Sequence, residues 1–290
     1  MMPPLRMPFP DYCALAGVNW STLGKMRASP KHYRDAVDHR RDPTAAQVTG
    51  SAVHALVLEP ETFREHFAVY EGEGTRASKD YKAFAAQQPD TVTTILKLDE
   101  YAEVVAMADA VDTHHAAGPL FTSGLAEMSF TWTDSATGIA CKGRTDWLCH
   151  DGWVSGDAGK PSRKRVILVD LKTSTSADAR EFGRSAARYG YHMQLAHYRA
   201  GLVANGYEVS QVLIVVVESS APYDVCVYEI TDDQLTKASA EVAALLARVK
   251  ECEESGEWPG RCDEITPLDL PAWVMGSDDV AVSPTLWGAT

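Results

Sequence analysis

The sequence has no paired cysteines and no long hydrophobic run, and each absence excludes a class of protein. Its six cysteines, at positions 13, 141, 149, 226, 252 and 262, form no C-x-x-C pair, which argues for reduced thiols and against a disulfide framework or an iron–sulfur cluster. No apolar run approaches the roughly 18–20 residues of a membrane span, and the first residues lack the apolar core of a signal peptide. We therefore expect a cytoplasmic protein that does not enter a membrane.

The net charge of −13 by itself argues against a nucleic-acid partner, but the charge is unevenly distributed. Residues 142–199 hold 11 basic and 6 acidic side chains, a local excess of +5. The rest of the chain holds 16 basic side chains against 34 acidic ones. A basic centre between acidic flanks is typical of an enzyme that gathers phosphates into one groove and repels them elsewhere.

A short apolar run, residues 166–169, ends in an acid and a lysine. This β-branched run, bounded by polar sequence, predicts a buried strand. Because residues i and i+2 of a strand point to the same face, Asp170 and Lys172 share one space and Leu171 faces the opposite layer. Burying such charges is costly unless they are paired or bound to a metal. The pair is either an ion pair at a strand end or an acid that holds a divalent metal beside a lysine that steers water, which suits phosphodiester hydrolysis.

Two further strands are predicted immediately before this one. Residues 126–132 alternate between polar and apolar side chains, and residues 139–149 return as a second strand after a turn. The hairpin carries Glu127 on its first strand and Asp146 on its second. Three consecutive strands, each with one acid, therefore predict a cluster of carboxylates.

Two predicted helices contribute further polar side chains. Residues 50–59 form an apolar helix that Pro60 ends, and His54 is the strongly polar side chain in its interior. A lone histidine on an apolar helix is usually a satisfied core residue, so its role at a metal stays one of two interpretations. The second helix is expected over residues 179–204.

This second helix carries a basic stripe. Its members recur at every fourth residue and are Arg180, Arg184, Arg188 and His192. Such a stripe is usually a solvated face, but one that leads away from a candidate metal site is also a candidate phosphate track. Gln194 and Tyr198, four residues apart, share another face of the same helix.

The order of these motifs resembles that of a known superfamily. It runs from the helix with His54 through Glu127, Gly143-Arg144-Thr145-Asp146 and Asp170-Leu171-Lys172 to Gln194 and Tyr198. This series resembles the PD-(D/E)XK nucleases, in particular their RecB-like branch and the RecE-type (exonuclease VIII-like) phage recombination exonucleases. The resemblance implies an α/β fold of restriction-endonuclease type, with a central mixed β-sheet flanked by helices.

The expected organisation is a single main domain with two flanking segments. Residues 1–18 are Pro-rich and are predicted to be irregular, and residues 259–290 are predicted to form a C-terminal extension. The resemblance covers residues 19–258, which would comprise a helical part (19–117) and a catalytic core (118–258).

The resemblance also implies roles for single residues. The implied metal ligands are Asp146, Asp170, the main-chain oxygen of Leu171, His54 and Glu127. Lys172 would orient or activate the attacking water or stabilise developing negative charge, and Gln194 and Tyr198 would position these residues and DNA. Residues 156–165 depart from the family pattern as a long basic loop, which we interpret as a contact with DNA or another subunit. The candidate DNA contacts are Arg144, Lys164, Arg165, Arg180, Arg184 and Arg188.

The function implied by the resemblance is that of a Mg²⁺-dependent deoxyribonuclease, with Mn²⁺ expected to substitute. It would degrade the 5′-ended strand at double-stranded DNA ends, in a bacterial or phage-infected cell, and leave 3′ single-stranded tails for recombination. A RecT-like single-strand annealing protein and a homo-oligomeric ring are the partners expected by resemblance. The alternatives are a RecB- or Cas4-like nuclease of other polarity or an endonuclease, a non-catalytic DNA-binding assembly protein, and a metalloenzyme acting on small phosphate esters.

Overall fold

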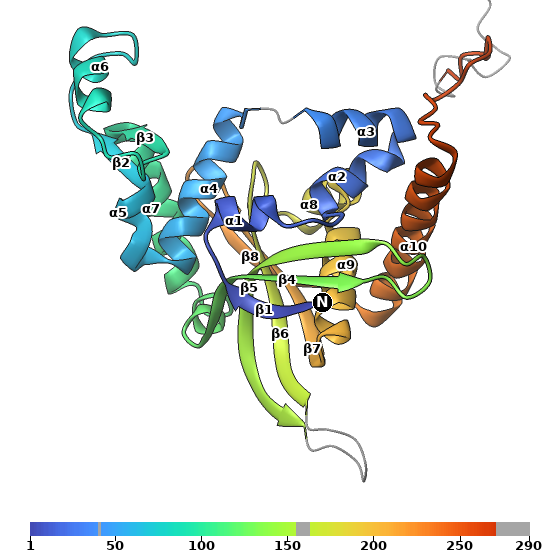
Figure 1. The fold of residues 1–290 in the computed structure, drawn as a ribbon. Coiled ribbons are helices and arrows are strands. Elements are labelled where there is room, and N and C mark those ends of the chain that lie inside the picture. Colours follow the sequence, from blue (N-terminus) through green and yellow to red (C-terminus); the bar gives the residue numbers. More distant parts are fainter. Residues whose placement is uncertain (40–41, 155–162, 271–290) are drawn as a thin grey trace, which may run out of the picture.

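A mixed six-stranded β-sheet forms the centre of the molecule (Figure 1). The computed structural model describes residues 1–39, 42–154 and 163–270. Neighbouring strands pair antiparallel except β6 and β7, which are parallel, so the predicted α/β fold with a mixed sheet is confirmed. In sheet order the strands are β1 (Met2–Arg6), β4 (Gly124–Thr133), β5 (Ala140–Val154), β6 (Arg163–Ser174), β7 (Tyr207–Glu218) and β8 (Val225–Glu229).

Helices cover both faces of this sheet and enclose two hydrophobic cores (Figure 1). Strand β6 shows why: Val166 and Leu168 pack in the first core, and Val169 and Leu171 pack in the second. The first core is covered by α2 (Trp20–Leu23), α3 (Pro30–Asp38), α9 (Tyr191–Ala204) and α10 (Asp232–Ser255). The second is covered by α4 (Ala45–Leu58), α5 (Phe63–His66) and α7 (Leu98–Thr113). Among the described residues, no helix is both long enough and apolar enough to cross a membrane.

The N-terminal segment is more ordered than its proline content predicts. Residues 1–18, expected to be irregular, contain β1 and the short helix α1 (Phe9–Ala14). Proline is tolerated in β1 because this strand lies at the edge of the sheet, where its outer side needs no ladder hydrogen bonds. Strand β1 pairs with β4, and α1 follows it and contacts β5 through the carbonyls of Tyr12 and Cys13 (Figure 1).

The long helix predicted over residues 179–204 is two helices. Helix α8 (Ala179–Tyr189) ends at Gly190, which has a φ of 74°, and α9 starts at Tyr191. A glycine adopts this left-handed conformation without the steric cost that other residues meet, so it ends the helix. The basic stripe therefore occupies α8 as far as Arg188, and His192 belongs to the next helix.

The remaining elements lie mainly at the periphery. Helix α4 begins at Ala45, earlier than the predicted residue 50, because Thr44 and Gln47 form a capping box at its start. A small parallel sheet of β2 (Phe67–Tyr70) and β3 (Thr94–Lys97) projects with α6 (Lys79–Ala86) away from the central sheet (Figure 1). The described residues also include the short 3₁₀ helices η1 (Gly24–Arg27), η2 (Pro60–Thr62) and η3 (Gly118–Phe121).

Candidate active site

Strand register brings the three predicted acids side by side. Strand β4 pairs with β5 so that Ala126 faces Trp147 and Met128 faces Thr145, which places Glu127 opposite Asp146. Strand β5 pairs antiparallel with β6, with Trp147 opposite Val169. The preceding residue of β5, Asp146, is therefore opposite the following residue of β6, Asp170. The β5–β6 ladder ends here, and the carboxylate of Asp146 accepts the Leu171 amide hydrogen at 2.9 Å in place of a strand partner.

The backbone at Glu127 is strained in a way that aims its side chain. Glu127 has a φ of 53°, a conformation that costs energy for any residue with a Cβ. Residues two apart in a regular strand face the same side of the sheet. Ala126 and Met128 do not, since Met128 packs in the first core and Ala126 packs in the second, so the strand is irregular at Glu127. The Glu127 carboxylate is thereby held among the other acids, and the Arg144 guanidinium binds it through Nε at 2.5 Å.

Asp170 and Lys172 form a buried ion pair, as their spacing predicts. Lys172 Nζ lies 2.6 Å from Asp170 Oδ2 and 4.0 Å from Asp146 Oδ2. Asp170 is only 1% exposed, and among the described residues no donor other than Lys172 reaches its carboxylate. A buried carboxylate with so few donors is costly to the protein without a further positive partner.

His54 reaches this cluster from helix α4. Its Nε2 lies 2.6 Å from the main-chain oxygen of Leu171 and must be the donor there, because a carbonyl can only accept. That tautomer leaves a lone pair on Nδ1, which lies 3.7 Å from Asp146 Oδ2. A ring nitrogen oriented through a carbonyl on its far side is the usual arrangement of a metal-binding histidine. The Leu171 oxygen, predicted as a ligand, keeps a second lone pair.

The cluster fits a divalent cation. Ligand atoms of His54, Glu127 and Asp146 all lie within 4.8 Å of one another. Asp170 adds buried carboxylate oxygens that have Lys172 as their sole donor among the described residues. Hard oxygen ligands with one imidazole suit Mg²⁺ or Mn²⁺.

Electrostatics at the cluster point in the same direction. Burial and the nearby charge of Asp146 raise the pKa of Glu127 to about 7, against the opposing effect of Arg144. Burial likewise raises the pKa of Asp170 to about 6, although Lys172 opposes the shift. Burial lowers the pKa of Lys172, but the two neighbouring aspartates outweigh it and raise that pKa above its ordinary value. The carboxylates therefore lack compensating positive charge, which a dication would provide.

Gln194 and Tyr198 support the site from helix α9. The amide of Gln194 donates to the Tyr198 hydroxyl at 3.3 Å, and the Tyr198 ring is buried. Tyr198 packs where β5 carries Gly143, at which an added Cβ would come within 3.1 Å of the tyrosine ring and 2.7 Å of Phe130. The glycine of the G-x-x-D motif thus lets α9 approach the strand that holds Asp146.

The predicted DNA contacts fall into three groups. Arg180, Arg184 and Arg188 are exposed on α8. Arg144 instead lies in the carboxylate cluster, where it binds Glu127 and donates to the Met7 oxygen and the Ser129 hydroxyl at 2.8 and 2.9 Å. Its guanidinium is thus occupied by protein groups.

Lys164 and Arg165 are separated from the site. They lie at the start of β6, seven or eight residues before Lys172, which is roughly 20–25 Å along a strand. Arg165 pairs with Asp151 at 3.0 Å and Glu208 at 4.0 Å, and Lys164 lies over the Tyr207 ring. This placement puts both away from the carboxylate cluster, and their contact with DNA stays a prediction. The loop predicted over 156–165 falls outside the described residues up to position 162.

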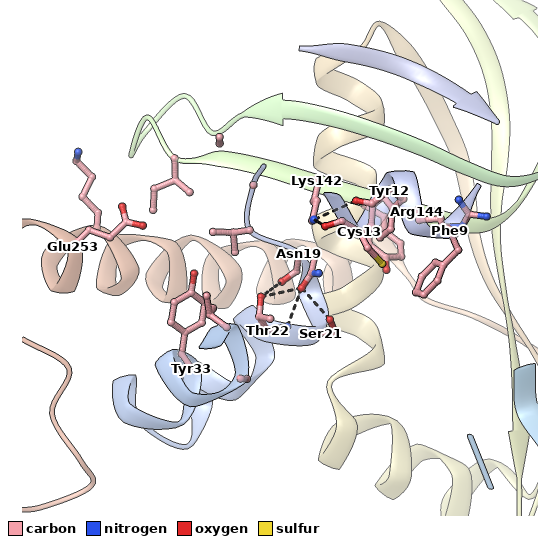
Figure 2. A pocket seen from close by; sticks show the side chains of 18 of the residues that line it. Phe9, Tyr12, Cys13, Asn19, Ser21, Thr22, Tyr33, Lys142, Arg144 and Glu253 are labelled. Carbon is pink, nitrogen blue, oxygen red and sulfur yellow. Dashed lines mark hydrogen bonds between the residues drawn. The ribbon is translucent and has the colours of Figure 1, made fainter. Parts of the chain in front are cut away.

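A cleft of about 920 Å³ opens beside the cluster, and sequence reasoning missed most of its lining. Figure 2 shows Phe9 and Arg144 at one end and Tyr33 and Glu253 at the other, with Asn19, Ser21 and Thr22 between them. Lys142 is buried in its wall, where its ammonium donates to the carbonyls of Tyr12, Cys13 and Leu15 at 2.6–3.2 Å. In the sequence, the lysine inside this predicted strand could have indicated the contact, because a buried ammonium needs hydrogen-bond acceptors.

Comparison with solved structures finds the same fold. A protein from Eubacterium rectale named "Putative exonuclease" is similar over 94% of this chain and 99% of its own, with a TM-score of 0.58 and 12% identity. A phage related exonuclease from Haemophilus somnus 129PT covers 85% of this chain and 99% of its own at 14% identity, with a TM-score of 0.34. At these values the first likeness establishes the fold alone, and the second adds no argument. The curated proteins gave no match.

The family comparison covers nearly the same residues as the motif series. The model of the PDDEXK-like domain of unknown function (DUF3799) matches residues 19–271. The match confirms the predicted PD-(D/E)XK superfamily. The chain belongs to the DUF3799 family of PDDEXK-like domains.

Proposed function

We propose that this protein is a metal-dependent DNA exonuclease that degrades the 5′-ended strand of linear duplex DNA and leaves 3′ single-stranded tails for recombination. It would act in the cytoplasm of a bacterial or phage-infected cell. The family and the fold support a nuclease. The observation that carries the proposal is the buried Asp170 carboxylate, which faces Asp146 and has Lys172 as its sole donor among the described residues.

The side chains divide the work of hydrolysis among them. Asp146, Asp170, Glu127 and His54 would hold Mg²⁺, or Mn²⁺ in its place. Such an ion, when bound, supplies Lewis-acid chemistry that polarises a phosphate oxygen and eases deprotonation of water. Lys172 directs its ammonium into the same space and can donate to the attacking water or to the phosphate as negative charge develops. Arg144 and the strained backbone at Glu127 fix the Glu127 carboxylate.

DNA is favoured over a small phosphate ester by the surroundings of the cluster. Helix α8 begins close after the Asp170–Lys172 strand and presents three exposed arginines at every fourth residue, which suits repeated phosphates. The cleft of Figure 2 opens directly onto Glu127 and Asp146, so an extended strand has room beside the ligands. The 5′ polarity and the role in recombination rest on the resemblance to RecE-type exonucleases.

The test is digestion of linear duplex DNA labelled separately at its 5′ and 3′ ends, with Mg²⁺, Mn²⁺ or EDTA. A closed circle of the same sequence is the control. We expect metal-dependent release of the 5′ label while the circle stays intact. Release of the 3′ label would reverse the polarity, and cutting of the circle would indicate an endonuclease. DNA binding without cleavage in either metal would indicate a non-catalytic assembly protein.

We also propose a homo-oligomeric ring and a RecT-like annealing partner, on the same resemblance. Light scattering of the purified protein at several concentrations would give its mass in solution, and a monomer throughout would contradict the ring. Binding to a purified RecT-like annealing protein, with and without DNA tails, would test the partner.

A further inference from the structure

Four aromatic rings form a continuous stack that passes beside Lys172 and ends on the surface. Three successive pairs are stacked: Tyr228 on Phe182, Phe182 on Tyr191, and Tyr191 on Tyr189, with centroids 5.8, 6.0 and 5.7 Å apart. The inner rings are anchored, since Phe182 is buried and the Tyr228 hydroxyl donates to the Ala177 oxygen. The outermost ring belongs to Tyr189, which is 56% exposed.

The stack lies next to Lys172, one of the predicted catalytic residues. Lys172 Nζ is 5.2 Å from the centroid of Tyr191, and the guanidinium of Arg188 is 5.7 Å from the centroid of Tyr189. Tyr189 is also the last residue of α8, the helix that carries the basic stripe. Its exposed ring therefore has the Arg188 guanidinium close by and connects to Lys172 through the ring of Tyr191.

The turn between α8 and α9 fixes the two tyrosines rigidly. Gly190 takes a φ of 74° between them, and Trp20 packs so closely that an added Cβ would come within 2.7 Å of its ring. Arg27 donates to the carbonyls of Ala187 and Arg188 at 3.1 Å and so caps α8. A stack held in this way is preorganised, because little side-chain freedom remains to be lost when a further ring joins it.

We propose that Tyr189 is a stacking platform for an unpaired nucleobase of the strand being cut. The proposal rests on the proposed nuclease function and names the part of the DNA that this surface binds. A flat, exposed ring at the end of a fixed stack can be continued by any base, because every base has a π-face. The adjacent arginines favour a ligand that carries phosphates, which distinguishes a nucleotide strand from an apolar protein segment.

The experiment uses a duplex with a short 5′ single-stranded end that carries 2-aminopurine, whose fluorescence falls when it stacks. Wild type, Tyr189→Ala and Tyr189→Phe are compared in EDTA, so that nothing is cleaved, by fluorescence and by anisotropy. Leu98→Ala, a 53% exposed apolar residue at the start of α7, is the surface control. Cleavage by each protein in Mg²⁺ and each melting temperature are measured in parallel.

We expect wild type, Tyr189→Phe and Leu98→Ala to quench the probe equally, whereas Tyr189→Ala loses the quenching and binds the end about 5- to 150-fold more weakly. The melting temperature of Tyr189→Ala should be unchanged, and its cleavage defect should fall mainly on KM. Tyr189→Ala that quenches and binds like wild type would overturn the platform, as would Tyr189→Phe that fails like Tyr189→Ala. Quenching without cleavage by wild type would overturn the nuclease function and leave the platform standing. If wild type neither binds nor cleaves, both are wrong.

Discussion

Lys172 is the residue whose replacement most directly separates chemistry from binding. Its ammonium lies 2.6 Å from Asp170, whereas the exposed arginines that would hold phosphates lie on another element. We predict that Lys172→Met lowers the cleavage rate about 10²- to 10⁴-fold, the range for removing one catalytic proton donor or acceptor. Affinity for DNA in EDTA should stay near that of wild type. Lys164→Met, on the same strand but far from the cluster, should cleave normally; equal loss in both variants would refute the assignment.

Metal binding can be measured on the folded protein without any substrate. A ligand that binds the native state alone stabilises it by about 2.7 kcal/mol at 100 times its Kd. We predict that Mg²⁺ or Mn²⁺ raises the melting temperature of wild type and that EDTA reverses the rise. Asp146→Asn should abolish the shift, because Asp146 lies between Glu127 and Asp170 in the cluster. An equal shift in Asp146→Asn would place the metal elsewhere.

His197 makes stability depend on pH through burial rather than through the active site. It packs against Trp132 and is 1% exposed, and burial lowers its pKa to about 4. The unfolded chain takes up this proton near pH 6.5, so between pH 6.5 and 4 it binds more protons than the native state. Stability is then lost as the pH falls below about 6.5.

The matched variant isolates this one group from the other titrations. Between pH 7 and 5, His197 should cost the wild type roughly 2 kcal/mol of unfolding free energy. His197→Phe keeps an aromatic ring against Trp132 and has no proton to bind. Between pH 7 and 5 its unfolding free energy in urea should therefore fall by roughly 2 kcal/mol less than that of wild type. Parallel pH profiles of the two proteins would show that the protonation of His197 does not matter.

At the scale of elements, Gly183 inside α8 and Gly190 at its C-terminal cap offer a matched pair. Gly190→Ala would force a Cβ into a left-handed conformation and against Trp20, so we expect a loss of about 1–2 kcal/mol or more. Gly183 lies in the interior of α8, where an added Cβ meets nothing within 4 Å. Gly183→Ala should therefore stabilise the protein by about 0.5–1 kcal/mol through helix propensity. Urea unfolding of both variants checks the opposite signs, and two changes of the same sign would contradict the description of this turn.

The same helix shows how far the sequence could predict the structure. Period-two alternation and a turn correctly predicted the hairpin that carries Glu127 and Asp146, and a short apolar run correctly predicted the buried strand that ends in Asp170. The prediction of one helix over residues 179–204 was wrong at Gly190. The four-residue spacing of basic residues continues to His192, and a single glycine is tolerated inside many helices, so the sequence did not indicate the break. The aromatic stack went unseen because its members come from three elements that only tertiary packing brings together. Likewise, the strand β1 is defined by its partner β4 and not by its own proline-rich residues.

At the scale of the whole molecule, the question is how a chain of net charge −13 binds a polyanion. The structure separates its cations into those already paired and those that are available. Lys142, Arg144 and Arg165 are bound to carbonyls or carboxylates of the protein. The three arginines of α8 are exposed, and none of them has an acidic partner among the described residues. Binding should therefore depend on the α8 face and not on the count of basic residues.

Salt dependence measures this directly, because each phosphate contact releases counterions and adds about 0.9 to the slope of log K against log salt. We predict that replacing Arg180, Arg184 and Arg188 together by glutamine lowers the slope for duplex binding in EDTA by about 3. Replacing Lys164 and Arg165 by glutamine removes charge of the same sign but should leave the slope unchanged, since Arg165 is paired with Asp151 and Glu208. If the slope falls equally for both sets of variants, binding follows net charge alone, and α8 is an ordinary solvated face. If it falls for the second set only, the DNA crosses the opposite end of β6, and the path from α8 to the carboxylate cluster must be abandoned.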